Sequence, residues 1–380
     1  MARRAGSLCL VTLLITAAVA CRGSEPPRLA PGSKAPDFTL PGIDGRTHAL
    51  SEFAASKVLA VVFTGTSCPA SQLYESRIQK LYDDYRARGV TVVAINPNKP
   101  ASMQPADLGY SDVGETLDDM KARAAHRGLT YPFLSDAASQ SVAKQFLVTT
   151  TPHVFVFDEA RSLRYDGRLD DDVQGAAVKA SEARQAIEAL AGGGTVPVSR
   201  TPVTGCPVNG LAGPAPVAAA AVKEPVTVDM ASADDLKRLR QNGTNKLLLV
   251  NFWATWCVPC AREFPDLETT YRMYKGRGLE FTAVSVNDPA ERPAVLEFLQ
   301  EYRAAHRNLL FSTSDVYGLQ AAFDPAMPAP VPFTLLLAPN GDVLHQELGE
   351  LDVLKLRRAI LRNLPDDPKF PGLQAYWSKP

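Results

Sequence analysis

The sequence has few cysteines and histidines, and it has no excess of either charge. Six cysteines in 380 residues are too few to hold a chain of this length together by disulfides. The chain has 40 basic and 41 acidic side chains, so its net charge is −1 and no basic surface for a phosphate backbone is expected. The five histidines lack the spacing of metal ligands. We therefore expect no nucleic-acid partner, no cofactor and no metal site.

Long apolar runs are absent as well, and the exception lies at the start of the chain. Arg3 and Arg4 precede an apolar run from Leu8 to Ala20 that is too short for a mature membrane-spanning helix, and small residues lead into Cys21. This pattern predicts an export signal over residues 1–21. A proline-containing tether over residues 22–34 would follow it.

The end of the export signal, Ala18-Val-Ala-Cys21, resembles a bacterial lipobox, in which the cysteine is acylated and becomes the mature N-terminus. Ala18 stands where the family usually has Leu. The resemblance implies that a lipid on Cys21 anchors the protein at a membrane of the bacterial periplasm or cell envelope. Secretion without a lipid is the alternative.

An internal repeat predicts two domains. Residues 57–68 and 246–257 each open with Lys, continue as an apolar strand and end with Cys eleven residues later. A Gly followed by a second apolar strand lies 21 residues after each Cys. Pro152 and Pro332 precede a further strand, 84 and 75 residues beyond the Cys, so the first copy has about nine extra residues, which we place within residues 96–130. At this spacing the repeats are duplicated domains and not a solenoid.

Within each copy apolar strands alternate with helical patterns, which predicts an α/β fold with a central mixed sheet flanked by helices. Residues 192–225 contain six Gly and six Pro and predict a linker. We assign residues 35–191 to the first domain and 226–365 to the second. Residues 366–380 would form a C-terminal tail.

The second copy carries the clearest chemical motif, Cys257-Val-Pro-Cys260, which follows a strand and opens a helix. A thiol at a helix N-terminus has its pKa lowered from about 8.5 toward about 7, so Cys257 is the predicted nucleophile. Cys260, one turn further on, is placed to resolve a mixed disulfide. Half of a zinc site is the alternative, but no second Cys pair or His pair supplies the other ligands.

Residues 251–260, Asn-Phe-Trp-Ala-Thr-Trp-Cys-Val-Pro-Cys, resemble the extracytoplasmic thioredoxin-like reductases of the TlpA/ResA type, and so does the Glu263-Phe-Pro-Asp-Leu segment behind them. The resemblance implies a thioredoxin fold, with Trp256 beside the nucleophile and a cis-proline, Pro332, facing the motif. Glu263 would accept the proton of Cys260 and return it. An ordinary first-turn Glu that only complements the helix dipole is the alternative.

The same resemblance implies the partners of the second domain. Protein disulfides would be the substrates, with apocytochrome c as one candidate client. A membrane thiol reductant would recharge the cysteine pair. The direction of electron flow stays open, because exported oxidants and reductants both use such pairs.

The first copy has a lone thiol, since Ser71 stands where the second copy has Cys260. A lone Cys68 needs a resolving thiol elsewhere or a peroxide substrate. Residues 35–206 resemble the peroxiredoxin-like redoxins related to the AhpC/TSA family, in Ala35-Pro-Asp-Phe-Thr-Leu and in two later segments, 93–98 and 165–171.

Peroxiredoxins place Thr three residues and Pro seven residues before the peroxidatic Cys, where this chain has Gly65 and Val61. The pocket that activates peroxide is therefore expected to be incomplete.

The resemblance also implies that Cys206 returns to Cys68 as a disulfide partner. Alternatively, Cys206 is a substrate of the second domain or an unpaired thiol. Pro152 is a second candidate cis-proline.

These observations predict an exported thiol-disulfide oxidoreductase that acts through Cys257 and Cys260. One alternative is a thiol peroxidase relay, in which Cys68 reacts with peroxide and the second domain regenerates it. Another is a first domain that serves as a non-catalytic docking scaffold.

Overall fold

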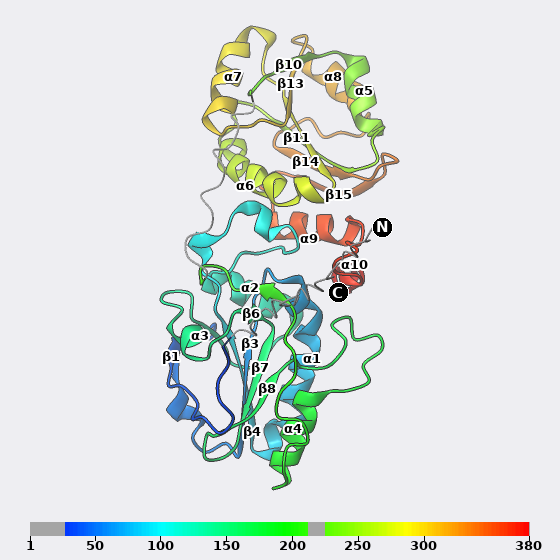
Figure 1. Ribbon diagram of the computed structural model, residues 1–380. Helices are drawn as coiled ribbons and strands as arrows, with labels where there is room; N and C mark the ends of the chain where they lie inside the picture. Colours follow the sequence, from blue (N-terminus) through cyan, green and yellow to red (C-terminus); the bar gives the residue numbers. More distant parts are fainter. Residues whose placement is uncertain (1–26, 212–224, 380) are drawn as a thin grey trace, which may run out of the picture.

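The computed structural model describes residues 27–211 and 225–379, so the predicted export signal and Cys21 lie outside the described residues. Figure 1 shows two domains stacked one above the other, with the helices of the chain's end between them. Within the described residues, no helix combines the length and the apolar character needed to cross a membrane.

The first domain is built on a five-stranded mixed sheet of order β5-β4-β3-β7-β8. Strands β3, β4 and β5 run parallel, and β7 and β8 complete the sheet as an antiparallel hairpin. Its strands are β3 (Val58–Phe63), β4 (Val90–Asn96), β5 (Phe133–Ser135), β7 (His153–Phe157) and β8 (Leu163–Gly167). Its helices are α1 (Pro69–Tyr85), α2 (Leu117–Arg127), α3 (Ser141–Gln145) and α4 (Glu182–Ala191). Two small two-stranded sheets pair β1 (Thr39–Pro41) with β2 (Thr47–Ala49) and β6 (Thr150–Thr151) with β9 (Cys206–Pro207).

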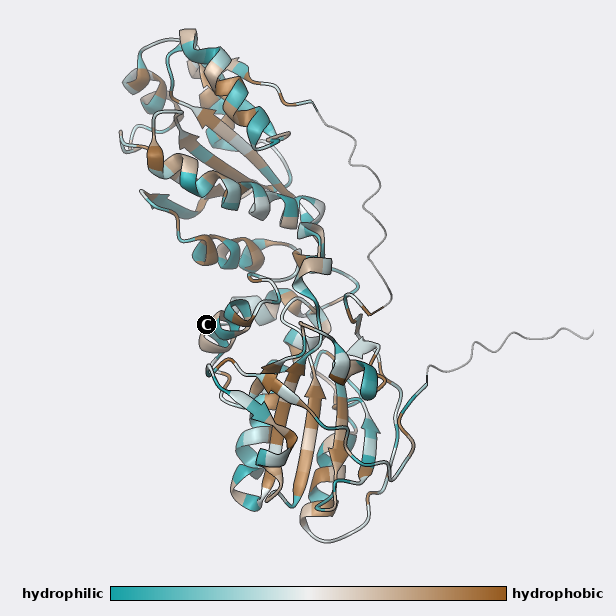
Figure 2. Cartoon of the chain, turned by 90° about the vertical axis from the view of Figure 1, so that its left-hand side faces the viewer, coloured by the Kyte–Doolittle hydropathy of each residue, from teal (hydrophilic) through white to brown (hydrophobic). Residues whose placement is uncertain are grey.

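Both faces of this sheet are buried, because alternate side chains of one strand enter different cores. In β3, Val58, Ala60 and Val62 pack with residues of α1, α2 and α4. The alternate side chains of the same strand, such as Val61 and Phe63, pack on the other face with residues of α3 and β1. Figure 2 shows the result as apolar strands between helices that are polar on the outside. A fully apolar strand in the sequence thus predicts a central, covered position.

The second domain has a six-stranded mixed sheet of order β10-β13-β12-β11-β14-β15. The four strands from β10 to β11 in this order run parallel to one another. Strand β14 is antiparallel to β11, and β15 is antiparallel to β14. The strands are β10 (Asp229–Ala231), β11 (Leu247–Trp253), β12 (Leu279–Ser285), β13 (Arg307–Phe311), β14 (Phe333–Leu337) and β15 (Val343–Leu348). The helices are α5 (Ala233–Gln241), α6 (Val258–Tyr274), α7 (Arg292–Glu301), α8 (Val316–Phe323) and α9 (Val353–Asn363), and α10 (Leu373–Ser378) follows them.

The two domains repeat the same strand-loop-helix unit, as the sequence predicts. Helices α1 and α6 each have 17 residues and begin directly after Cys68 and Cys257. The α/β fold class with two domains of mixed sheets is therefore confirmed. The extra residues of the first copy form a long loop between β4 and α2, which includes the short helix η4 (Pro105–Leu108).

The segment that follows α4 belongs to the first domain, although its Gly and Pro content predicts a linker. Val208 and Thr201 are buried, and β9 pairs with β6 in antiparallel register. Gly and Pro therefore mark an irregular path across the domain surface here, and the described part of the predicted linker, residues 192–211, is not a free spacer.

The predicted tether and tail also make contacts with the first domain. Arg28 donates to the backbone carbonyl of Thr201 over 2.9 Å and to Asp166 Oδ1 over 2.6 Å. At the other end of the chain, α10 packs against α1, and Tyr376 and Trp377 are buried. The end of the chain thus returns to the first domain and fixes the two domains to each other.

A buried charged cluster lies at this contact between the domains. Arg123 is fully buried and donates to Asp112 Oδ1 over 2.7 Å and to Tyr376 Oη over 3.2 Å. Tyr376 in turn donates to Glu75 of α1, and Arg358 of α9 donates to Asp112 Oδ2 over 2.7 Å. Although burial by itself would raise it, the guanidinium groups of Arg123 and Arg358 hold the pKa of Asp112 below its ordinary value. The interface therefore contains buried, paired charges, and the pair that joins the two domains is formed by the buried Asp112 and the partly exposed Arg358.

Candidate functional site

The second domain holds a disulfide between Cys257 and Cys260 at the start of α6, with a Cα–Cα distance of 5.3 Å. Cys257 is the N-cap residue of the helix, and its sulfur accepts the backbone N–H of Cys260 over 3.3 Å. A negative charge on this sulfur would be stabilised by that N–H and by the positive end of the helix dipole. The local sequence produces this arrangement because Pro259 occupies the first turn, where its missing N–H costs no hydrogen bond.

A cis peptide bond lies at the same end of the sheet as this disulfide. The Val331–Pro332 bond is cis, as the sequence nominates. Phe333, which follows it, pairs with Phe252 near the end of β11. Since Cys257 comes after the same end of β11, the cis-proline lies at the edge of the sheet that carries the disulfide.

The surface around the disulfide is apolar and exposed. Trp256 is 63% exposed and Val258 is 68% exposed, on either side of Cys257, which is only 5% exposed. Leu348, at the end of β15, is 51% exposed and pairs with Phe333 directly after the cis-proline. Exposed apolar side chains gathered at one place are typical of a site that contacts another molecule.

Glu263 lies one turn after Cys260 on α6, and its side chain is buried. It accepts hydrogen bonds from Asn251 Nδ2 over 3.1 Å and from the backbone N–H of Leu351 over 3.3 Å. Asn251 also donates to Thr334 over 3.0 Å. Burial raises the pKa of Glu263 to about 7, against the lowering effect of the hydrogen bonds from Asn251 and Leu351. This carboxyl is therefore able to take up or release a proton at neutral pH.

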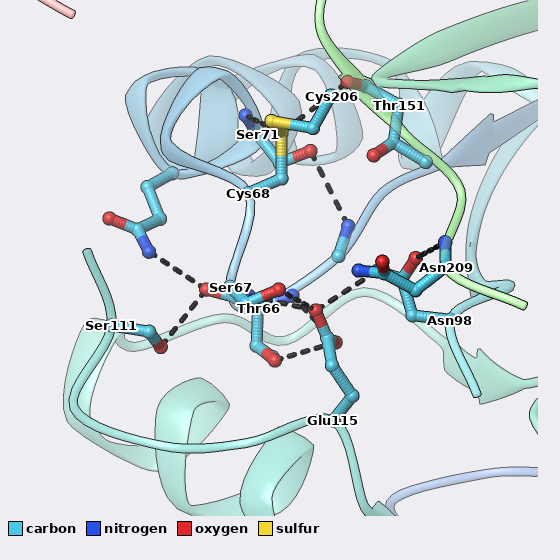
Figure 3. The surroundings of a disulfide bond; sticks show 12 residues. Thr66, Ser67, Cys68, Ser71, Asn98, Ser111, Glu115, Thr151, Cys206 and Asn209 are labelled. Carbon is cyan, nitrogen blue, oxygen red and sulfur yellow. Dashed lines mark hydrogen bonds between the residues drawn. A yellow bond between two sulfur atoms is a disulfide. The ribbon is translucent and has the colours of Figure 1, made fainter. Parts of the chain in front are cut away.

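The first domain holds the second disulfide, between Cys68 and Cys206, with a Cα–Cα distance of 5.8 Å (Figure 3). Cys68 caps α1 as Cys257 caps α6, and its sulfur accepts the backbone N–H of Ser71 over 3.4 Å. The carbonyl oxygen of Thr151 lies 3.4 Å from the same sulfur. The Thr151–Pro152 bond that follows is cis. Cys206 therefore provides the disulfide partner that Cys260 provides to Cys257, but it comes from a distant segment, and Ser71 occupies the helix position that corresponds to Cys260.

Glu115 holds the loop before Cys68, and the sequence analysis does not single it out. Its carboxylate is buried and accepts from the backbone and the hydroxyl groups of both Thr66 and Ser67. It also accepts from Asn96 Nδ2 over 2.6 Å and from Asn98 Nδ2 over 2.9 Å (Figure 3). In the sequence, only its position in the insertion of the first copy could have pointed to Glu115, because the burial of a carboxylate leaves no local sequence pattern.

His153, which follows the cis-proline, takes part in a buried hydrogen-bonded contact. Its Nε2 atom lies 2.6 Å from Asp166 Oδ1, which also accepts from Arg28. Burial lowers the pKa of His153 below its ordinary value, so the ring is uncharged at neutral pH. Within residues 27–211 and 225–379, no group of three or more potential metal-binding side chains is present.

Known families match both halves of the chain. Residues 31–166 match the AhpC/TSA family, and residues 216–360 match the Redoxin family. The thiol-disulfide oxidoreductase ResA of Bacillus subtilis is 33% identical over 106 residues, which are 28% of this chain and 55% of ResA. A protein of Mycobacterium tuberculosis named as a peroxiredoxin is 31% identical over 109 residues, which are 29% of this chain and 59% of that protein. The chain thus spans a little over half the length of the curated relatives that it matches.

Among solved structures, a hypothetical protein of Sinorhizobium meliloti is 34% identical, with a TM-score of 0.43. The match covers 48% of this chain and 95% of that protein.

The fold and the two helix-capping disulfides define a thioredoxin-fold thiol protein with two domains. More closely, the first half of the chain is similar to the AhpC/TSA family, and the second half is similar to the Redoxin family and to ResA.

Proposed function

We propose that the second domain is a thiol-disulfide oxidoreductase that reduces protein disulfides through Cys257 and Cys260. The observation that carries the proposal is the disulfide of these two residues at the start of α6, beside the cis-proline Pro332. The similarity to ResA, whose name states this activity, supports it.

The reaction follows from the positions of the two thiols. The Cys257 thiolate attacks one sulfur of a client disulfide, a bond forms between them, and the second client sulfur leaves as a thiolate that takes up a proton. Cys260 then loses its proton and attacks Cys257. This step releases the first client sulfur and leaves the Cys257–Cys260 disulfide seen in the structure. One client disulfide is reduced as one cysteine pair is oxidised.

Glu263 is the proposed acceptor of the Cys260 proton. It lies on the same helix one turn away, its side chain is buried, and its pKa is about 7. A base with a pKa near the working pH accepts and returns a proton most effectively. Asn251 orients this carboxyl through a hydrogen bond of 3.1 Å.

Trp256 and Val258 are the proposed contacts to the client. Both are apolar and largely exposed beside the nucleophile, so an unfolded client segment with apolar residues around its cysteine fits this surface. Apocytochrome c is one such candidate client.

We further propose that the protein is exported and anchored by a lipid on Cys21, in the periplasm or cell envelope. The apolar segment before Cys21 supports export, and the resemblance of residues 251–260 to extracytoplasmic reductases fits the same location. A membrane thiol reductant would return the oxidised pair to its dithiol form.

A Cys260→Ser variant tests the exchange reaction, because it removes the step that releases the client. We expect this variant to accumulate mixed disulfides with client proteins that dithiothreitol dissolves, and the wild type to reduce insulin. The Cys257→Ser variant is the matched control and should trap nothing. An absence of trapped protein together with an absence of insulin reduction would refute the proposal.

A second candidate function is peroxide reduction by the first domain, and the Cys68–Cys206 disulfide favours it. The Cys68 thiolate would attack a peroxide and become a sulfenic acid, with release of an alcohol or water, and Cys206 would then attack this sulfenic acid to form the disulfide and release water. Stopped-flow measurements of peroxide consumption test the relay, which requires both Cys68 and Cys257. If Cys68→Ser consumes peroxide as fast as the wild type, the first domain is not a peroxidase. Loss of client binding on deletion of residues 35–190 would then support a docking scaffold.

A further inference from the structure

We propose that the Cys68–Cys206 disulfide is a substrate of the Cys257–Cys260 pair of a second copy of the chain, and that Cys206 is the sulfur attacked. This inference rests on the exchange chemistry proposed for the second domain. It names the disulfide that is reduced, the atom that is attacked and the molecule that attacks it.

Access favours attack on Cys206. Cys68 is 3% exposed, enclosed between the start of α1 and the cis-proline loop, whereas Cys206 is half-buried in the surface segment that covers it. In thiol-disulfide exchange the accessible sulfur is the one that an incoming thiolate reaches. Figure 3 shows Cys206 on the side of the bond that faces away from Glu115.

The leaving group favours the same direction. When Cys206 is attacked, Cys68 leaves as a thiolate at the N-cap position of α1, where the Ser71 N–H and the helix dipole stabilise the charge. When Cys68 is attacked, Cys206 leaves from the two-residue strand β9 and is not itself the cap of a helix. The thiol with the lower pKa leaves faster, so both effects select Cys206.

The surface beside Cys206 fits the surface around Cys257. A cavity of about 210 Å³ lies next to Gly205. It is lined by the first domain and by the C-terminal tail, with Ala70, Leu73, Val173, Thr204, Phe370 and Pro371 among its residues. Most of these side chains are apolar, as are the exposed Trp256 and Val258. We therefore expect the Trp256–Val258 surface of a second copy to contact this cavity as its Cys257 approaches Cys206.

The reaction requires two copies because the two centres of one chain are held apart. Cys257 lies at one end of the 17-residue helix α6, and Tyr274 at the other end donates to the carbonyl oxygen of Ser111 over 2.6 Å. These ends are about 25 Å apart at 1.5 Å per residue. Ser111 itself donates to Thr66 in the loop before Cys68. The first domain is thus anchored to the end of α6 that is remote from the nucleophile.

The electron balance is complete without another reagent. The Cys257 thiolate bonds to Cys206 as the Cys68–Cys206 bond breaks, and Cys68 becomes a thiolate. Cys260 then gives up its proton and bonds to Cys257, and Cys206 leaves and takes up a proton. The product is one oxidised Cys257–Cys260 pair and one reduced pair of Cys68 and Cys206.

Two full-length variants separate the attacking and the attacked centre, both in a background in which Cys9 and Cys21 are replaced by Ser. The donor has Cys68→Ser, Cys206→Ser and Cys260→Ser and is used with Cys257 reduced. The acceptor has Cys257→Ser and Cys260→Ser and keeps its own disulfide. The two are mixed, quenched with an alkylating agent, and mapped by non-reducing peptide mass spectrometry.

We expect a covalent dimer that joins Cys257 of the donor to Cys206 of the acceptor, with Cys68 recovered in alkylated form. An acceptor that also has Cys206→Ser is the matched control and should form at least tenfold less dimer. A dimer joined through Cys68, or no dimer, would overturn the proposal. The donor with Cys260 restored must still reduce insulin; if it does not, the proposed function fails, and the two failures are thereby distinguished.

The requirement for two copies has its own measurement. In the chain with both cysteine pairs intact, the rate at which the Cys68–Cys206 disulfide opens after rapid reduction of the Cys257–Cys260 pair should rise in proportion to protein concentration. A rate independent of concentration would show reaction within one chain and would refute this part of the proposal.

Discussion

Glu263 introduces a carboxyl that titrates near neutral pH into the second domain. Its pKa of about 7 arises mainly from burial, and the charges of Glu347 and Glu350 act in the same direction. The hydrogen bonds from Asn251 and Leu351 favour the ionised form but do not cancel the effect of burial. The residue is thus held at the pKa that proton exchange with Cys260 requires.

Glu263→Gln keeps the shape of this side chain and removes its ionisation. Loss of a general base costs roughly 100-fold or more in rate, so we expect insulin reduction to slow by about that factor. The rise in rate through about pH 7 should disappear with it. Glu280→Gln, at an exposed salt bridge with Lys246, is the control and should match the wild type. An unchanged pH profile in Glu263→Gln would contradict the role of this carboxyl.

The same carboxyl makes stability depend on pH. Its pKa in the folded protein lies above the ordinary value of 4.5, so the folded state binds the proton more tightly than the unfolded state does. Its stabilising effect is complete below the ordinary value and is lost as the pH rises through about 7. We expect the melting temperature of the wild type to fall more steeply than that of Glu263→Gln between about pH 5 and about pH 8. Parallel curves would show that other groups cause the fall.

Glu115 is a buried carboxylate of the first domain. It organises a loop, whereas the role proposed for Glu263 is proton exchange. Both oxygens accept only, from Thr66, Ser67, Asn96 and Asn98. In Glu115→Gln an NH₂ group would face these donors, and unmet buried donors cost about 1–3 kcal/mol each. We expect urea denaturation to show at least that loss, with the exposed Glu159→Gln as a control. A variant as stable as the wild type would refute this account.

At the scale of elements, one loop and one helix connect the domains. The loop between β4 and α2 provides Glu115 to the Cys68 site and Ser111 and Asp112 to the second domain. Helix α10 returns from the second domain and places Tyr376 between Arg123 and Glu75. The insertion that distinguishes the first copy is thus the part that makes the two domains one unit.

Tyr376→Phe tests this connection with little change in packing. The hydroxyl is lost, so Glu75 loses a donor and Arg123 an acceptor in a buried site, at a cost of about 1–3 kcal/mol. We expect a lower urea midpoint and faster amide exchange in α10. Tyr317→Phe is the control, because that side chain is 74% exposed. Unaltered exchange in α10 would mean that the hydroxyl does not hold the helix.

At the scale of the whole molecule, the Cys68–Cys206 disulfide joins residues 138 positions apart and closes a loop of nearly the whole first domain. In the chain-entropy model a loop of this length stabilises the folded state by about 5 kcal/mol. Cys206→Ser should therefore lower the free energy of unfolding of the first domain by several kcal/mol. The Cys257–Cys260 bond closes only a three-residue separation, so its removal should matter far less.

Guanidinium denaturation with probes in each domain measures this difference. The unfolding transition of the first domain should move to lower denaturant concentration in Cys206→Ser and stay nearly constant in Cys257→Ser. Equal shifts in the two variants would contradict the assignment of a structural role to the long loop.

The sequence by itself determined the local architecture. The repeated Lys-strand-Cys-helix unit predicts both domains, because apolar runs and helix starts are local properties. The X-Pro pairs predict both cis bonds as candidates, since such bonds are nearly confined to proline. The helix start at Cys257 likewise follows from residues next to it in the chain.

Only the tertiary structure decided which distant residues meet. The pairing of Cys68 with Cys206, the buried Glu115 and the return of Tyr376 to α1 all join positions far apart in the sequence. The composition of a Gly- and Pro-rich stretch predicts a free linker. Residues 199–211 are instead part of the first domain, because Val208 is buried and Cys206 pairs with Thr151. Burial, long-range hydrogen bonds and disulfide pairing depend on the packed chain as a whole, and no local pattern encodes them.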